Sequence, residues 1–193
     1  MNEASAQTQN TTELERICME AAEGDLKAKN QLTQLLDHAS DNIRDWSDEA
    51  REVWDSSFEL LLESIEDEIT EVDLHLLYQT LRLGYDRKNL RDAFANAVRA
   101  CSSRYGDPAA LITALRVYDQ NSGPEEIAWR WECFRHLHPQ RFCFHENNDT
   151  GQILMLDDLA NKVKLTFDRE TELDLEQALT KLVVLESDST LEQ

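Results

Sequence analysis

The spacing of apolar residues changes once along this chain, near Arg141, and this change limits the folds available to it. Upstream, apolar residues recur every three to four positions, as in an amphipathic helix; one such series is Val53, Trp54, Phe58, Leu61 and Leu62. From Arg141, the segment RFCFHENNDTGQILMLDDLANKVKLTFD alternates apolar and polar residues, as strands do. The sequence therefore predicts an α+β, mainly α fold: an irregular multi-helix bundle or short α-solenoid, followed by a small β-rich C-terminal module.

Helix start and stop signals divide the 193 residues into four segments. Residues 1–11 are small and polar and predict a disordered tail. Thr12 and Glu15 have the spacing of a capping box, which predicts a helix start, and Pro139 predicts the end of the last helix. The predicted segments are a disordered tail at 1–11, a helical domain at 12–139, a β-rich module at 140–186 and a disordered tail at 187–193.

About seven helices are predicted within the helical domain. Asp25, Ser47, Thr70 and Asp107 mark the starts of four of them, because short polar side chains cap the first turn of a helix. One helix is predicted over 87–105, and the helix after Asp107 is predicted to continue through Tyr118. The predicted module has strands at 141–145, 152–156, 162–167 and 182–185, a turn at 146–150 and a helix at 173–180.

Charge is distributed unevenly along the chain. The net charge is −20, from 19 basic and 39 acidic residues, and residues 1–70 alone hold 18 acids and 5 bases. An acidic chain lacks the phosphate-neutralising charge that dominates nucleic-acid binding, so no direct DNA or RNA binding is expected. A basic protein partner and simple solubility both remain as explanations.

The cysteines and the apolar runs indicate a cytoplasmic protein. Cys18, Cys101, Cys133 and Cys143 are widely spaced without a C-x-x-C pair, which is typical of free thiols in a reducing compartment. Met1–Thr12 does not resemble a secretory leader, and no apolar run approaches the ~20 residues that span a membrane. We therefore expect no membrane partner, and the oligomeric state stays open.

Two sequence patterns are candidates for a catalytic or metal site. Cys133, His136, His138, Cys143 and His145 follow the spacing C-x2-H-x-H-x4-C-x-H, which matches no common zinc motif. Within this series, Cys143 and His145 are also conceivable as a nucleophile and base. The tripeptide Asp149-Thr150-Gly151 occurs in aspartic proteases, but a turn explains it better here. We predict no enzyme, no catalytic residue, no metal and no cofactor.

The segment around Trp129 has the most unusual local composition. Trp129, Trp131 and Arg135 are of the residue types favoured as interface anchors. Two tryptophans two positions apart on one helix do not both face the core. Docking between domains and contact with an external partner are both compatible with this pattern.

The last part of the chain resembles a module in the N-terminal extension of Gre-type transcript cleavage factors of chlamydiae and their relatives. The shared pattern is an aromatic strand, Gly-x-Ile, an acidic turn, Val-x-Leu-x-Phe and a short helix. In this chain it is carried by Phe142, Phe144, His145, Gly151, Ile153, Val163, Leu165, Phe167, Ala178 and Leu182–Leu185. The preceding Arg104–Asp107 turn is similar in style.

The resemblance implies a protein-binding accessory of transcription that contacts RNA polymerase, with Phe142, Phe144 and Gly151 as contact residues. The family's glycine-rich turn is replaced here by ENNDT, and no segment resembles its catalytic coiled coil, so no catalytic residue carries over. The alternative is an acidic nucleic-acid mimic or inhibitor that occupies the basic cleft of a DNA-binding protein through Glu59, Glu63 and Glu66.

Overall fold

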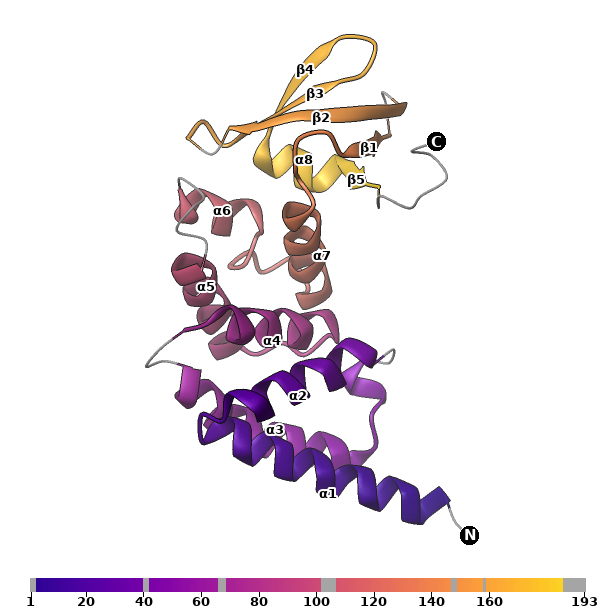
Figure 1. Ribbon diagram of the computed structural model, residues 1–193, viewed down its shortest axis with the longest axis vertical. Coiled ribbons are helices and arrows are strands. Elements are labelled where there is room, and N and C mark those ends of the chain that lie inside the picture. The colour runs from indigo at the N-terminus through magenta and orange to yellow at the C-terminus, as the bar shows by residue number, and fades with distance from the viewer. Residues whose placement is uncertain are drawn as a thin grey trace. The chain divides into compact units, whose positions relative to one another are not determined.

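Figure 1 shows the computed structural model, which describes residues 3–39, 42–65, 69–101, 107–146, 149–157 and 159–185, with only the backbone described for 3–10 and 149. Helices and a small antiparallel sheet confirm the predicted α+β, mainly α class. Tertiary contacts divide the chain into two compact units. We call Met1–Cys101 with Gly123–Glu125 the helical unit, and Ser102–Ser122 with Glu126–Gln193 the C-terminal unit.

The described part of the helical unit contains five α-helices and a short 3₁₀ helix. α1 packs against α2 and α3, α2 packs against α4, and α5 packs against α3 and α4. Its core includes the fully buried rings of Trp54, Phe58 and Phe94. The helices are α1 Glu3–Ala22, α2 Leu26–His38, η1 Ile43–Asp45, α3 Asp48–Ile65, α4 Glu71–Arg82 and α5 Lys88–Cys101.

α1 begins earlier than the sequence predicts. The structure continues the helix back to Glu3, through residues predicted as a disordered tail, so Thr12 lies inside α1 rather than at its start. The physical reason is that residues 3–11 contain two alanines and neither glycine nor proline, so nothing in them interrupts a helix. At its other end α1 is followed by Gly24, which adopts a φ of 88°.

Three predicted helix starts in this unit are confirmed by their caps. For α3, the hydroxyl of Ser47 accepts a hydrogen bond from the backbone N–H of Ala50 at 3.2 Å. Asp25 Oδ1 accepts hydrogen bonds from the backbone N–H groups of Lys27 and Ala28, at 2.7 and 3.1 Å. Thr70 and Asp73 form a capping box at the start of α4. These bonds satisfy backbone donors that the first helical turn cannot pair internally.

A buried ion pair joins α2 to α4. Nζ of Lys29 lies 2.8 Å from Oδ1 of Asp73, and the two side chains are 8% and 0% exposed. Oδ2 of Asp73 also accepts hydrogen bonds from the backbone N–H and the hydroxyl of Thr70, at 2.9 and 2.7 Å. Both charges have lost water, so each is tolerated because the other is present.

α6 (Pro108–Ala114) and α7 (Pro124–Arg135) precede the sheet in the chain. Asp107 caps α6 as predicted, but α6 ends at Ala114 instead of continuing through Tyr118. The reason is local, since Arg116 adopts a left-handed φ of 57°. The buried Arg130 of α7 donates to the carbonyl oxygen of Ala114 at 3.1 Å, which satisfies an acceptor at the end of α6.

A five-stranded antiparallel sheet with strand order β4-β3-β2-β1-β5 follows α7. α8 contacts β3 and β4, and α6 contacts α8; Figure 1 shows α8 on one side of the sheet. The buried side chains on this side include Ile153, Val163, Leu165, Ala178 and Leu179. The elements are β1 Phe142–His145, β2 Asp149–Asp157, β3 Lys162–Thr166, β4 Glu170–Asp174, α8 Leu175–Lys181 and β5 Leu182–Val184.

The sheet differs from its prediction in two places. β4 was not predicted: its sequence ETELD holds one apolar residue, and it becomes a strand by pairing along β3. The second difference is the predicted turn at 146–150. Asp149 and Thr150 belong to β2 and pair with His145 and Phe144, so the Asp-Thr-Gly tripeptide is strand rather than turn.

The change from helix to strand falls between Arg135 and Phe142, close to the predicted boundary after Pro139. The compact units divide elsewhere, between Cys101 and Ser102, so α6 and most of α7 group with the sheet.

Residues 102–106, including most of the predicted Arg104–Asp107 turn, and the predicted tail at 187–193 lie outside the described residues. Among the described residues, no helix is long and apolar enough to cross a membrane.

Candidate functional site

One side of the sheet exposes apolar side chains. On β1, Cys143 and His145 are buried, whereas Phe144 between them is 40% exposed. Phe144 lies opposite Val183 of β5, which is 44% exposed. Alternate residues of a strand point to opposite sides of a sheet. This pair therefore marks the side facing away from the core, which we call the outer face.

A β-bulge in β2 adds two apolar residues to the outer face. Ile153 pairs with Leu165 and Met155 pairs with Lys164, so Leu154 is an extra residue in the strand. Regular alternation would turn Met155 toward the core. With the bulge, Leu154 and Met155 are both exposed.

Phe142 completes this apolar area. It lies two residues before Phe144, on the same side of β1, and it is half-buried opposite Gln152. Toward β4 the sheet becomes charged, where Lys162 donates to Glu172 at 2.5 Å. The apolar area thus covers β5 and β1, and on β2 it continues at Leu154 and Met155, beyond the polar Gln152. We call it the outer-face patch; its residues are Phe142, Phe144, Leu154, Met155 and Val183.

The three predicted anchor residues on α7 differ in their exposure to solvent. Trp131 is 6% exposed and stacks on Phe134, with ring centroids 5.7 Å apart, whereas Trp129 is 50% exposed. Arg135 donates to the Glu132 carboxylate at 3.1 Å on the helix surface. As expected for positions two apart, only one of the tryptophans packs into the core.

Gly151, the sixth predicted contact residue, is buried in β2. A Cβ atom at this position would lie 2.3 Å from the Phe167 ring and 2.7 Å from the Thr166 carbonyl oxygen. The Phe167 ring in turn packs edge-on against His145, with centroids 5.8 Å apart. The absence of a side chain at Gly151 therefore makes room for Phe167, and this position belongs to the packing of the sheet rather than to its surface.

The cysteines and histidines near the helix–sheet junction do not form a metal-binding group. Among the described residues, no three His, Cys, Asp or Glu side chains are placed to hold a metal ion. His136 instead contacts the Glu132 carboxylate at 2.9 Å. Burial raises the pKa of Cys143 to about 11, and burial followed by the nearby Glu132 charge raises the pKa of Cys133 to about 11. Both thiols therefore stay protonated near neutral pH, whereas a nucleophile needs the thiolate.

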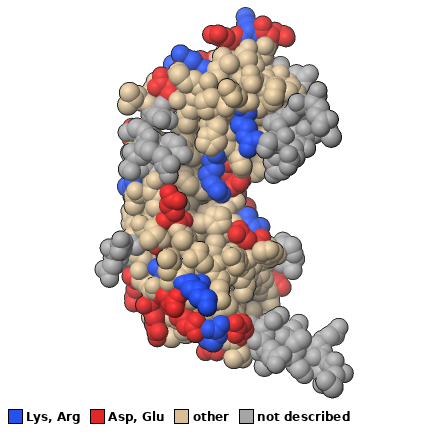
Figure 2. Space-filling view, viewed as in Figure 1, with Lys and Arg blue, Asp and Glu red and all other residues tan. Residues whose placement is uncertain are grey.

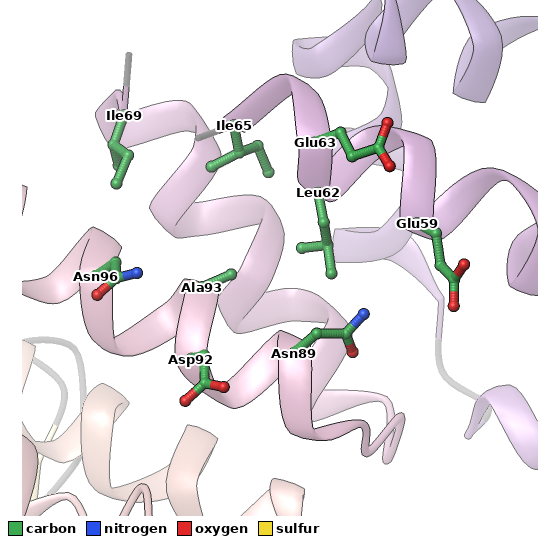
Figure 3. Close-up of a pocket in the computed structure, with 9 residues that line it drawn as sticks. All are labelled: Glu59, Leu62, Glu63, Ile65, Ile69, Asn89, Asp92, Ala93 and Asn96. Atoms are coloured by element: carbon green, nitrogen blue, oxygen red, sulfur yellow. The ribbon is translucent and has the colours of Figure 1, made fainter. Parts of the chain in front are cut away.

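The helical unit holds a groove of a different character between α3 and α5. Its volume is about 580 Å³, and Figure 3 shows the side chains that line it. Apolar side chains and carboxylates share its walls. The lining residues are Glu59, Leu62, Glu63 and Ile65 of α3, Ile69 before α4, and Asn89, Asp92, Ala93 and Asn96 of α5. We call this the α3–α5 groove.

The groove is acidic. Among the described residues, Glu59, Glu63 and Asp92 form no salt bridge. Figure 2 shows acidic side chains gathered around α1–α3 on the face in view, with some basic ones among them. The sequence indicated Glu59 and Glu63 as an acidic helix face, and Glu66 of the same face lies outside the described residues. Asp92 was missed, because nothing in the sequence places α5 beside α3.

No protein-family model, no curated protein and no solved structure matches this chain at a significant level.

Proposed function

We propose that this chain is a non-catalytic, protein-binding accessory of transcription that contacts RNA polymerase. The observation that carries the proposal is the outer-face patch. Large apolar side chains on the surface of a soluble protein occur singly, but several on one sheet face favour a protein interface. Phe144 and Val183 lie directly opposite each other, and Phe142, Leu154 and Met155 extend the patch along β1 and β2.

The link to transcription rests on the resemblance to Gre-type extensions. Two aromatic residues of that resemblance, Phe142 and Phe144, belong to the outer-face patch. Phenylalanine carries much of the energy in interfaces because it buries a large area on binding. The protonated state of Cys133 and Cys143 also supports a binding role over thiol catalysis.

The test is binding of the full chain to RNA polymerase purified from its native cell. The variant Phe144→Ser/Val183→Ser removes the centre of the patch, and Leu26→Ser/Leu60→Ser is the matched control because both leucines are exposed in the helical unit. Burial of a large apolar side chain contributes about 1.5–3 kcal/mol. We expect the first variant to bind at least about tenfold more weakly, which corresponds to about 1.4 kcal/mol.

The control variant should bind within about twofold of the wild-type chain, a difference of less than 0.5 kcal/mol. No binding of the wild-type chain to the polymerase would refute the transcription role. Equal losses in the two variants would refute the assignment to the outer face.

The acidic mimic is a second candidate, and the exposed carboxylates of Glu59 and Glu63 favour it. A mimic competes with DNA for a basic cleft, so its binding weakens steeply as salt rises. The test is competition with a DNA duplex for a basic DNA-binding protein, with Glu59→Gln/Glu63→Gln as the variant. Competition that the variant retains in full would contradict this candidate.

A further inference from the structure

We propose that the α3–α5 groove binds a basic amphipathic segment of a protein partner. Lysine or arginine side chains of that segment would meet the carboxylates of Glu59, Glu63 and Asp92. Its apolar side chains would enter the groove beside Ile69 and Ala93, which are both partly exposed. This site lies in the helical unit and does not depend on the outer-face patch.

The positions of Glu59 and Glu63 are unfavourable for the stability of α3 itself. Glu59 and Glu63 are four positions apart on α3, where like charges repel by a few tenths of a kcal/mol. A cation brought by a partner relieves this repulsion. Residues that lower the stability of their own helix are expected at functional positions.

The apolar part of the groove distinguishes a peptide from other cationic partners. A nucleic-acid mimic needs only a charged surface, because it replaces phosphates. Figure 3 shows Leu62, Ile65 and Ile69 directed into the space beside Ala93 of α5. Leu62 and Ile65 are already buried, at 7% and 2% exposed. An occupant would therefore remove water mainly from the partly exposed Ile69 and Ala93. The occupant therefore needs cations and apolar groups on one face, which is the pattern of an amphipathic helix in a groove.

The size of the groove fits this occupant. On α3 the lining residues extend from Glu59 to Ile65, and on α5 from Asn89 to Asn96. At 1.5 Å per residue, each wall is about 10 Å long, or about two helical turns. Two turns present two or three apolar side chains and a similar number of charged ones along one face. The three carboxylates of the groove match that number of cations.

The test uses three synthetic peptides of about 15 residues, a length at which helices begin to form. The first places leucine on one face and lysine beside it. The second replaces every lysine with glutamate, and the third replaces every leucine with serine. Fluorescence anisotropy measures binding of each labelled peptide to the full chain. We expect saturable binding of the lysine–leucine peptide, with at least about tenfold weaker binding of the other two, or about 1.4 kcal/mol.

Charge variants locate the site. Glu59→Gln/Glu63→Gln/Asp92→Asn neutralises the groove, whereas Glu15→Gln/Glu23→Gln/Glu52→Gln neutralises three exposed acids elsewhere in the helical unit. Both triple variants change the net charge equally. The groove variant should weaken binding of the lysine–leucine peptide by about tenfold or more, and the control by less than about twofold.

Three results would overturn the proposal. Equal weakening by the two triple variants would mean that the peptide responds to overall charge. Equal binding of the lysine–serine peptide would mean that the apolar side chains contribute nothing, as for a nucleic-acid mimic. Failure of the wild-type chain to bind the lysine–leucine peptide would leave the groove without the proposed occupant. None of these results bears on polymerase binding through the outer face, so the two proposals fail separately.

Discussion

Replacing Lys29 with methionine should destabilise the helical unit far more than removing an exposed cation. Methionine keeps most of the volume of the lysine stem, so the main change is loss of the ammonium that lies 2.8 Å from Asp73. The Asp73 carboxylate is then left buried without a counter-charge. Breaking a buried ion pair on one side costs about 3–5 kcal/mol.

The structure places the expected loss near the lower end of this range, at about 3 kcal/mol. The reason is that Asp73 keeps its two hydrogen bonds from Thr70. With a urea slope of about 2 kcal/mol per molar, the unfolding midpoint should fall by roughly 1.5 M. Circular dichroism at 222 nm follows the unfolding, and hydrogen exchange of the α2 and α4 amides assigns the change to the helical unit.

Two further variants test the reasoning. Arg16→Met removes a cation that pairs with Glu13 and Glu20 on the exposed surface of α1, and it should hardly move the midpoint because solvent screens that pair. Adding Asp73→Asn to Lys29→Met removes the buried charge and should recover most of the loss. The explanation is refuted if Lys29→Met behaves like Arg16→Met, or if Asp73→Asn gives no recovery.

Three further predictions concern glycine packing, helix capping and pH. Gly151→Ala should destabilise the chain by about 1–3 kcal/mol in urea unfolding, because the added Cβ would overlap the Phe167 ring. Gly24→Ala is the comparison, because a Cβ at Gly24 would contact no neighbouring atom, although Gly24 has a positive φ. A stability loss for Gly151→Ala no larger than the loss for Gly24→Ala would contradict this. Thr70→Ala should cost about 1 kcal/mol by removing the capping box of α4, and unchanged hydrogen exchange at the start of α4 would count against it. Stability should fall as pH rises from 9 toward 11, because the buried Cys143 thiol, with its pKa raised to about 11, keeps a proton that the thiol of the unfolded chain releases. Cys143→Ala should lessen this fall in stability. The same pH profile in the variant and the wild-type chain would argue against the raised pKa of Cys143.

Local chemistry accounts for the parts of the fold that the sequence predicted well. The starts of α2, α4 and α6 were predicted from Asp25, Thr70 and Asp107, and all three side chains form the expected caps. Capping hydrogen bonds join residues two or three positions apart, so they depend on nearby sequence alone. The alternation after Arg141 likewise predicted β1 and β3, because a half-buried strand exposes every second residue.

The errors of prediction arise where distant segments meet. β4 has little strand signal of its own and exists because β3 offers it a pairing edge. The β-bulge that exposes both Leu154 and Met155 follows from the register between β2 and β3, which alternation alone does not reveal. Tertiary packing also decides which of the six predicted contact residues reach the surface, and it buries Trp131 and Gly151.

The sequence by itself determined the mainly helical class, the helix caps, the C-terminal sheet and the uneven negative charge, since these follow from residue type and short-range spacing. Only the tertiary structure decided that Asp92 joins Glu59 and Glu63 around one groove, and that β5 places Val183 against Phe144. Such sites combine residues from segments that are far apart in the chain. Their positions depend on which apolar faces pack together, and a periodic pattern shows that a face is buried without showing what covers it.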